Sequence, residues 1–185
     1  MISEIIRSRR AVFPSQYNDT PISKEEINTI LEAANWAPTH RRTEPWRFKV
    51  FHSADSREQL AQFLGKKYEE TVTPYSEFKH KKVMDKPLQS GCVIAICMQR
   101  DPKESVPEWE EVASTAMAVQ NMWLVAHDMG VGTYWSTPAL KNYLGDLVSL
   151  APGEKCLGFF YMGKYDNALP EGERKTAIEE KTSWV

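Results

Sequence analysis

The feature that most constrains the fold is an apolar run, CVIAICM, at Cys92–Met98. The run is partly β-branched, has the length of a strand and contains no polar residue. A strand that is apolar on both faces must be covered on both faces, since apolar surface left in water costs free energy. The sequence therefore predicts a central strand in a sheet that is buried on both sides.

Two segments carry strong helix signals. Residues 108–129 are rich in Ala, Met and Val and contain no Gly or Pro, which predicts a long helix at the centre of the domain or of a dimer. Ser23 and Glu26 have the spacing of a capping box at a helix N-terminus, and Pro38 marks the end of that helix. The buried stripe of this second helix is predicted to be Ile27, Ile30, Leu31 and Ala34.

Shorter patterns complete a small sheet. Trp46, Phe48 and Val50 alternate with polar residues, which predicts a half-buried strand. Further strands are expected after a turn at Gly130 and over residues 156–165, and further helices near the N-terminus and over residues 56–69 and 138–145. The elements do not follow a regular βαβ order, so the predicted class is α+β, with many helices around a small sheet.

The chain of 185 residues has the length of about one domain. Residues 70–90 are polar and rich in Lys, with Pro74 and Pro87, and we expect a mobile helical excursion or lid over about 65–90. After Tyr165 the composition is polar again. We expect residues 166–185 to form a tail that finds no partner in its own subunit.

Charge and cysteine content narrow the class of protein. The net charge of −2 and the pI of about 6.1 argue against a general nucleic-acid binder or a protein of anionic membranes. Three cysteines without CxxC spacing favour a reducing compartment. The N-terminus lacks the charge order of a secretory signal, and no apolar stretch has the length of a membrane span. We therefore expect a cytoplasmic protein.

Common catalytic and metal motifs are not evident. The four histidines are scattered, so no metal site is predicted, and there is no GxSxG motif of a serine hydrolase. The GVG of Gly130–Gly132 follows a helix and lacks a third glycine, so it indicates a helix C-cap and a turn rather than a dinucleotide site. Trp109 and Trp123, at helical positions, are expected to be packing residues.

Basic residues form clusters that are far apart in the sequence. Because a phosphate needs two or three fixed donors to leave water, these clusters are candidates for one phosphate-bearing ligand; taken singly, each also fits a solvated surface. They are Arg7, Arg9 and Arg10, then His40, Arg41 and Arg42, then Arg174 and Lys175.

The same residues resemble a known family. RSRRAVF at Arg7–Phe13 and PISKEEINTILEAANWAPTHRRTEPWRFKVF at Pro21–Phe51 are similar to the opening blocks of the FMN-dependent nitroreductases. Residues 106–135, the strand at Gly158–Gly163 and the ERK of the tail resemble later blocks. The likeness spans nearly the whole chain, and the length and the APTH loop resemble the family's small, minimal branch.

The resemblance implies a small, mostly antiparallel sheet surrounded by helices, in a homodimer with swapped terminal segments. It also implies FMN bound in two pockets at the interface. The residues that match the family's cofactor-binding positions are Arg9, Arg10, Ala11, His40, Glu44, Trp135, Ser136, Thr137 and Arg174. Ala11 stands where the family usually has Ser, and Glu44 stands where Gln is common. Glu44 either places a negative charge near the flavin or pairs with an arginine of its own loop.

The function implied is that of an oxidoreductase that passes hydride from NADH or NADPH through FMN to nitroaromatic, quinone or similar acceptors in a ping-pong cycle. No catalytic side chain is named, because the flavin carries the chemistry. One alternative is a flavin-binding module without turnover, and another is an RNA-binding protein that uses RSRR and THRR. The sequence does not distinguish NADH from NADPH or name the acceptor.

Overall fold

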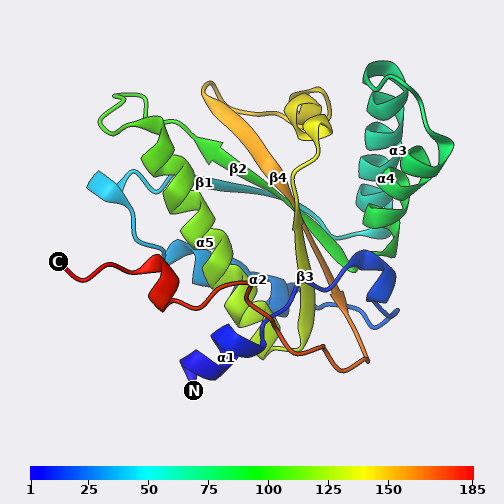
Figure 1. Cartoon of the computed structure of the whole chain (residues 1–185). Helices are drawn as coiled ribbons and strands as arrows, with labels where there is room; N and C mark the ends of the chain where they lie inside the picture. The colour runs from blue at the N-terminus through cyan, green and yellow to red at the C-terminus, as the bar shows by residue number, and fades with distance from the viewer.

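The computed structural model describes residues 1–185 and has a four-stranded antiparallel sheet at its centre (Figure 1). The spatial order is β1-β2-β4-β3, so β2 is an interior strand. The predicted α+β class with a small antiparallel sheet is confirmed. The strands are β1 (Trp46–Phe51), β2 (Cys92–Gln99), β3 (Val131–Ser136) and β4 (Glu154–Lys164).

The side chains of β2 alternate between two cores. Ile94 lies in the core beneath α2 (Lys24–Asn35) and α5 (Glu108–Asp128). Val93 lies on the other face, in the core beneath α3 (Ala54–Thr71). The prediction of a central strand covered on both faces is confirmed, and its apolar run is explained because neither face meets water.

The N-terminus of α2 has the predicted capping box. The Ser23 Oγ accepts a hydrogen bond from the Glu26 N–H at 3.1 Å, and a Glu26 carboxylate oxygen accepts one from the Ser23 N–H at 2.8 Å. The predicted stripe faces the core, although Leu31 is only partly buried. The helix ends at Asn35, shortly before Pro38.

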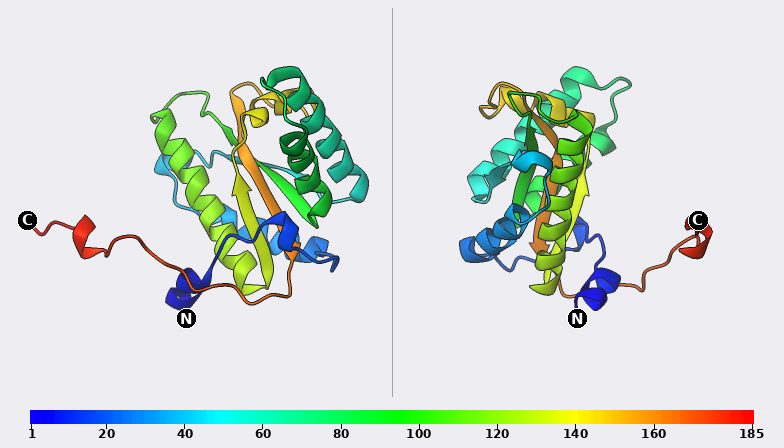
Figure 2. Two further views of the ribbon diagram at one scale, coloured as in Figure 1. Left: turned by 45° about the vertical axis from the view of Figure 1, so that its right-hand side comes forward. Right: turned by 90° about the vertical axis from the view of Figure 1, so that its left-hand side faces the viewer.

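The remaining helices lie at the periphery. α4 (Glu77–Gln89) packs against α3, and a Cβ at Gly65 would lie 2.8 Å from the Met84 sulfur, so glycine permits the close approach. α1 (Ile2–Ser8) lies near the C-terminal end of α5, and the tail projects away from the body of the subunit (Figure 2). Short 3-10 helices occur at Pro14–Gln16, His40–Arg42, Ala139–Asp146 and Glu179–Lys181. None of the helices combines the length and the apolar character needed to cross a membrane.

Two packing predictions are wrong for this chain. Val50 is 42% exposed, because β1 is an edge strand and the helices on that face reach Trp46 and Phe48 but not Val50. Trp109 is 69% exposed, since the first turn of α5 turns this side chain away from the sheet. Trp123 does pack as expected, with its ring 5.7 Å from that of Phe160.

Candidate functional site

A cationic cluster forms where the tail passes the end of α1. The Arg9 guanidinium lies over the indole of Trp123, 4.5 Å from the ring centroid. Partial burial lowers the pKa of Arg9, and the charges of Arg10 and Arg174 lower it further. None of these arginines forms an ion pair with an acidic side chain. Positive charge gathered without an ion-pair partner favours an anionic ligand such as a phosphate.

Arg10 holds the tail in place. Its guanidinium donates to the carbonyl oxygens of Arg7 at 2.6 Å, Arg9 at 2.8 Å and Pro170 at 3.0 Å. These bonds join the end of α1 to the beginning of the tail, and the exposed Arg174 follows four residues later. Two of the three basic clusters of the sequence therefore meet in one place.

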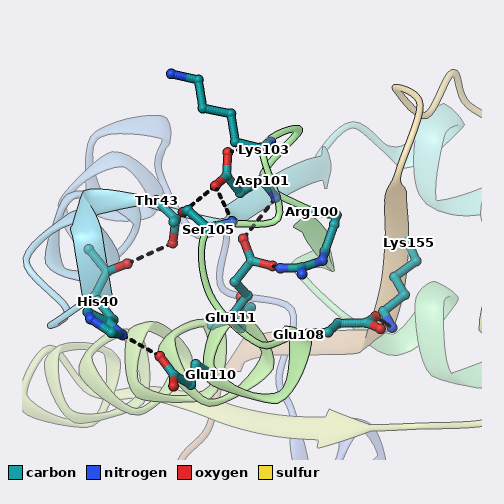
Figure 3. Close-up of polar contacts among 12 residues, drawn as sticks. His40, Thr43, Arg100, Asp101, Lys103, Ser105, Glu108, Glu110, Glu111 and Lys155 are labelled. Carbon is teal, nitrogen blue, oxygen red and sulfur yellow. Dashed lines mark hydrogen bonds and ion pairs between the residues drawn. The ribbon is translucent and has the colours of Figure 1, made fainter.

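The third basic cluster lies in a strained loop before β1. Arg41, Arg42 and Glu44 have φ angles of 51°, 55° and 43°, a region that side chains other than Gly rarely adopt. Residues held there cost about 1–3 kcal/mol each and concentrate at functional sites. His40 Nδ1 lies 2.6 Å from a Glu110 carboxylate oxygen, and this contact ties the loop to the first turn of α5 (Figure 3).

The Glu44 carboxylate is exposed and forms no ion pair. Arg47 donates instead to the backbone carbonyl oxygen of Glu44 at 2.9 Å. The Glu44 N–H donates to Thr39 Oγ1 at 3.3 Å. The ion pair between Glu44 and an arginine of its own loop is therefore not found. No cation of the chain neutralises the Glu44 carboxylate by direct contact.

A polar network supports the N-terminal end of α5 (Figure 3). The Glu111 side chain is fully buried, pairs with Arg100 and accepts a hydrogen bond from the Asp101 N–H at 2.9 Å. Asp101 in turn accepts hydrogen bonds from the Ser105 hydroxyl and from the backbone N–H groups of Ser105 and Lys103, and these bonds lower its pKa. The network fixes the turn between β2 and α5 and, through the helix, the position of Glu110.

The end of β3 presents an aromatic side chain with an unsatisfied donor. The Trp135 Nε1 is buried and has no hydrogen-bond partner. A Cβ at Gly158 would lie 2.5 Å from this nitrogen, so only glycine allows the indole to lie against β4. Ser136 is buried, and Thr137 follows at the surface. A buried donor without a partner costs about 1–3 kcal/mol, so this close packing of Trp135 on β4 comes at the expense of a hydrogen bond.

The predicted site residues fall into separate groups within one chain. Arg9 lies against Trp123 whereas His40 lies against Glu110, and thirteen helical residues separate these contacts by about 20 Å. One phosphate cannot reach both groups, so a phosphate-bearing ligand that used all three basic clusters would contact the His40 loop with a part other than its phosphate. Ala11 is exposed and lies between the Arg9 group and Val12, whose N–H joins the edge of β3.

Two residues at the site were missed from the sequence. Glu110 lies seventy positions from His40, so no local spacing connects them. Trp123 was assigned to packing alone, although its second face supports Arg9. A helical tryptophan gives no sequence signal for a stacked arginine from another element.

Comparison with known proteins identifies the family. The model of the nitroreductase family matches residues 6–164. The chain belongs to the nitroreductase family. Among curated relatives, YfhC of Bacillus subtilis, provisionally named an NAD(P)H nitroreductase, is 25% identical over 98% of this chain and 92% of its own length.

Solved nitroreductase structures share the fold. The nitroreductase-like family protein from Bacillus cereus is 28% identical, with a TM-score of 0.83 over 100% of this chain and 96% of that one. A Desulfovibrio desulfuricans protein solved in complex with FMN is 22% identical, with a TM-score of 0.73 over 98% of this chain and 94% of that one. The predicted family and nitroreductase-like fold are confirmed.

Proposed function

We propose that this nitroreductase is an FMN-dependent NAD(P)H oxidoreductase that works as a homodimer in the cytoplasm. The observation that carries the proposal is the uncompensated cationic group of Arg9, Arg10 and Arg174. In a chain with net charge −2, a cationic group of this kind, with Arg9 and Arg10 partly buried, matches the phosphate of a bound nucleotide. The three free cysteines support the reducing location.

The residues present fit FMN. Arg9 and Arg174 offer unpaired guanidinium donors for the phosphate, whereas Arg10 holds the segments that carry them. When bound, FMN supplies hydride acceptance from NADH or NADPH and delivery of electrons to a second substrate.

The side chains around the ring have positioning roles in this proposal. His40 is held by Glu110, and Trp135, Ser136 and Thr137 form one continuous segment at the end of β3. Ala11 adds no hydroxyl, so the phosphate depends more on the arginines. No side chain is required as a general acid or base, which matches the absence of a named catalytic residue.

The site is completed by a second copy in this proposal. The two groups of site residues lie about 20 Å apart along α5, and the outer face of that helix carries the exposed Trp109 and Met117. A groove of about 420 Å³ lies between this face and Pro38–His40. Arg10 holds the beginning of the tail at Pro170, and the largely exposed residues 173–185 beyond it are the segment that exchanges between subunits in this proposal.

The activity is tested by anaerobic oxidation of NADH and NADPH with nitroaromatic and quinone acceptors. We expect NAD(P)H consumption that depends on an acceptor and parallel initial-rate lines, as a ping-pong cycle requires. FMN binding without NAD(P)H oxidation would favour the flavin-binding module, and a purified protein without flavin absorbance that binds RNA would favour the third hypothesis.

Glu44→Gln is expected to raise the midpoint potential of bound FMN. A carboxylate near the flavin disfavours the negative charge gained on reduction, because like charges repel in a partly dry site. For a two-electron couple the rise is about 30 mV for each 1.4 kcal/mol of repulsion removed. Spectroelectrochemical titration measures it, with Glu58→Gln on α3 as the matched control. A potential that stays unchanged or falls would show that Glu44 does not tune the cofactor.

A further inference from the structure

Cys97 and Cys156 face each other across the middle of the sheet. They are register partners on the antiparallel strands β2 and β4, and both side chains lie in the core beneath α3. Register partners on antiparallel strands have Cα atoms about 4.5–5.5 Å apart, within the range that a disulfide spans. Both are free thiols, so the pair is placed for a disulfide but reduced.

The strand pairing is irregular at this pair. Ile96 pairs with Gly158 whereas Cys97 pairs with Cys156, so Leu157 has no partner and forms a bulge. Bulges bend a strand and are frequent beside functional sites. The Cys156 thiol donates a hydrogen bond to the Gly158 carbonyl oxygen at 3.4 Å. The pair therefore lies beside the glycine that leaves room for the Trp135 indole.

The two sulfurs differ in access. Cys156 lines a surface cavity of about 330 Å³ whose wall includes Lys141 and Lys155. Cys97 has no exposed surface and does not line this cavity. A small uncharged oxidant that enters the cavity therefore meets Cys156 first, and Cys97 lies behind it.

The groups around the pair also favour reaction at Cys156 rather than at Cys97. The neighbouring Cys97 thiol holds the pKa of Cys156 below its ordinary value, and Lys141 adds to the effect, whereas burial and Glu154 oppose it. The neighbouring Cys156 thiol and burial raise the pKa of Cys97. The thiolate is the nucleophilic form of cysteine, so Cys156 is the member of the pair prepared to react.

Cys92 is an internal control. It lies five residues before Cys97 on β2, but it points into the other core and its register partner is Met162. Burial raises its pKa to about 12. It has no thiol as its register partner and does not line the cavity at Cys156.

We propose that Cys156 and Cys97 form a redox-active thiol pair that a peroxide converts to a disulfide. The Cys156 sulfur attacks one oxygen of the peroxide and the O–O bond breaks. With hydrogen peroxide the products are a sulfenic acid on Cys156 and one water. The Cys97 sulfur then attacks the Cys156 sulfur, the S–O bond breaks, and the hydroxyl leaves as a second water with the Cys97 proton. Two thiols are oxidised by two electrons and one peroxide is reduced to two waters.

Intact mass and thiol counting test the proposal on the full-length wild-type protein. After hydrogen peroxide, followed by unfolding without reductant, we expect the three thiols to fall to one. The mass should fall by that of two hydrogen atoms, peptide mapping should join Cys97 to Cys156, and dithiothreitol should reverse both changes. A count that stays at three, or a disulfide between two chains, would overturn the proposal.

Variants separate the roles of the two sulfurs. Cys97→Ser should leave a Cys156 sulfenic acid that dimedone traps, and Cys156→Ser should retain both of its thiols under the same treatment. Cys92→Ser should form the disulfide as the wild type does. In the wild type we expect Cys156 to react about tenfold or more faster than Cys92, because Cys156 lines a cavity whereas Cys92 is buried with a raised pKa. Equal rates at the two residues would contradict the assignment.

Discussion

Replacing Arg9 with alanine is expected to weaken FMN binding by about ten- to hundredfold, because a charge-assisted contact is worth about 1.5–3 kcal/mol. Arg9 is partly buried over Trp123, so its guanidinium is already positioned and little rotamer entropy remains to be lost on binding. Arg174→Ala is expected to weaken binding in the same range. Titration of the apoprotein with FMN, followed by flavin fluorescence, measures both dissociation constants.

The matched control for these variants is Lys66→Ala. Lys66 also carries a positive charge, but it lies on α3 and its nearest acid is Glu70 at 3.8 Å. We expect less than a twofold change in its FMN affinity and no change in folding for any of the three variants. Unchanged dissociation constants in both arginine variants would remove Arg9 and Arg174 from the site.

Glu111→Ala is expected to lower the free energy of unfolding by about 3 kcal/mol, the lower end of the range for removing one partner of a buried ion pair. The substitution deprives Arg100 of its partner and leaves the Asp101 N–H without its acceptor. The lower end applies because the Arg100 side chain keeps some contact with water. Urea unfolding followed by circular dichroism measures the change.

Glu108→Ala is the control for this stability prediction. Glu108 lies one turn earlier on α5 and pairs with Lys155, but both side chains are about half exposed. Exposed ion pairs contribute little because water solvates both partners. A Glu111 variant as stable as the Glu108 variant would show that the buried network does not hold the turn before α5.

Local patterns predicted the elements of this fold, and long-range contacts decided what the patterns left open. The Ser23 capping box and the apolar run of β2 are confirmed because their signals lie within a few residues of each other. The prediction for Val50 was wrong because the burial of a side chain on an edge strand depends on helices elsewhere in the chain. The fold class could be predicted because the periodicity of each segment, and the order of the segments along the chain, are both read directly from the sequence.

The candidate site was predicted less completely than the fold. The meeting of Arg9 with Arg174 depends on Arg10 and its bond to Pro170, which no spacing in the sequence encodes. The burial of Glu111 could not be predicted, because a run of acidic residues at the start of a helix is typical of a solvated first turn. Its partner Arg100 comes from the end of the neighbouring strand.

Size-exclusion chromatography of the purified protein, with light scattering and flavin absorbance recorded on the same peak, tests the central proposal most directly. We expect a particle of twice the 21.2 kDa chain that carries FMN in a ratio of one to each chain, since the two groups of site residues are too far apart to meet in one subunit. An obligate interface of this kind buries more than about 2,000 Å², so the dimer should persist on dilution. A monomer that retains FMN, or a dimer that binds none, would contradict the proposal.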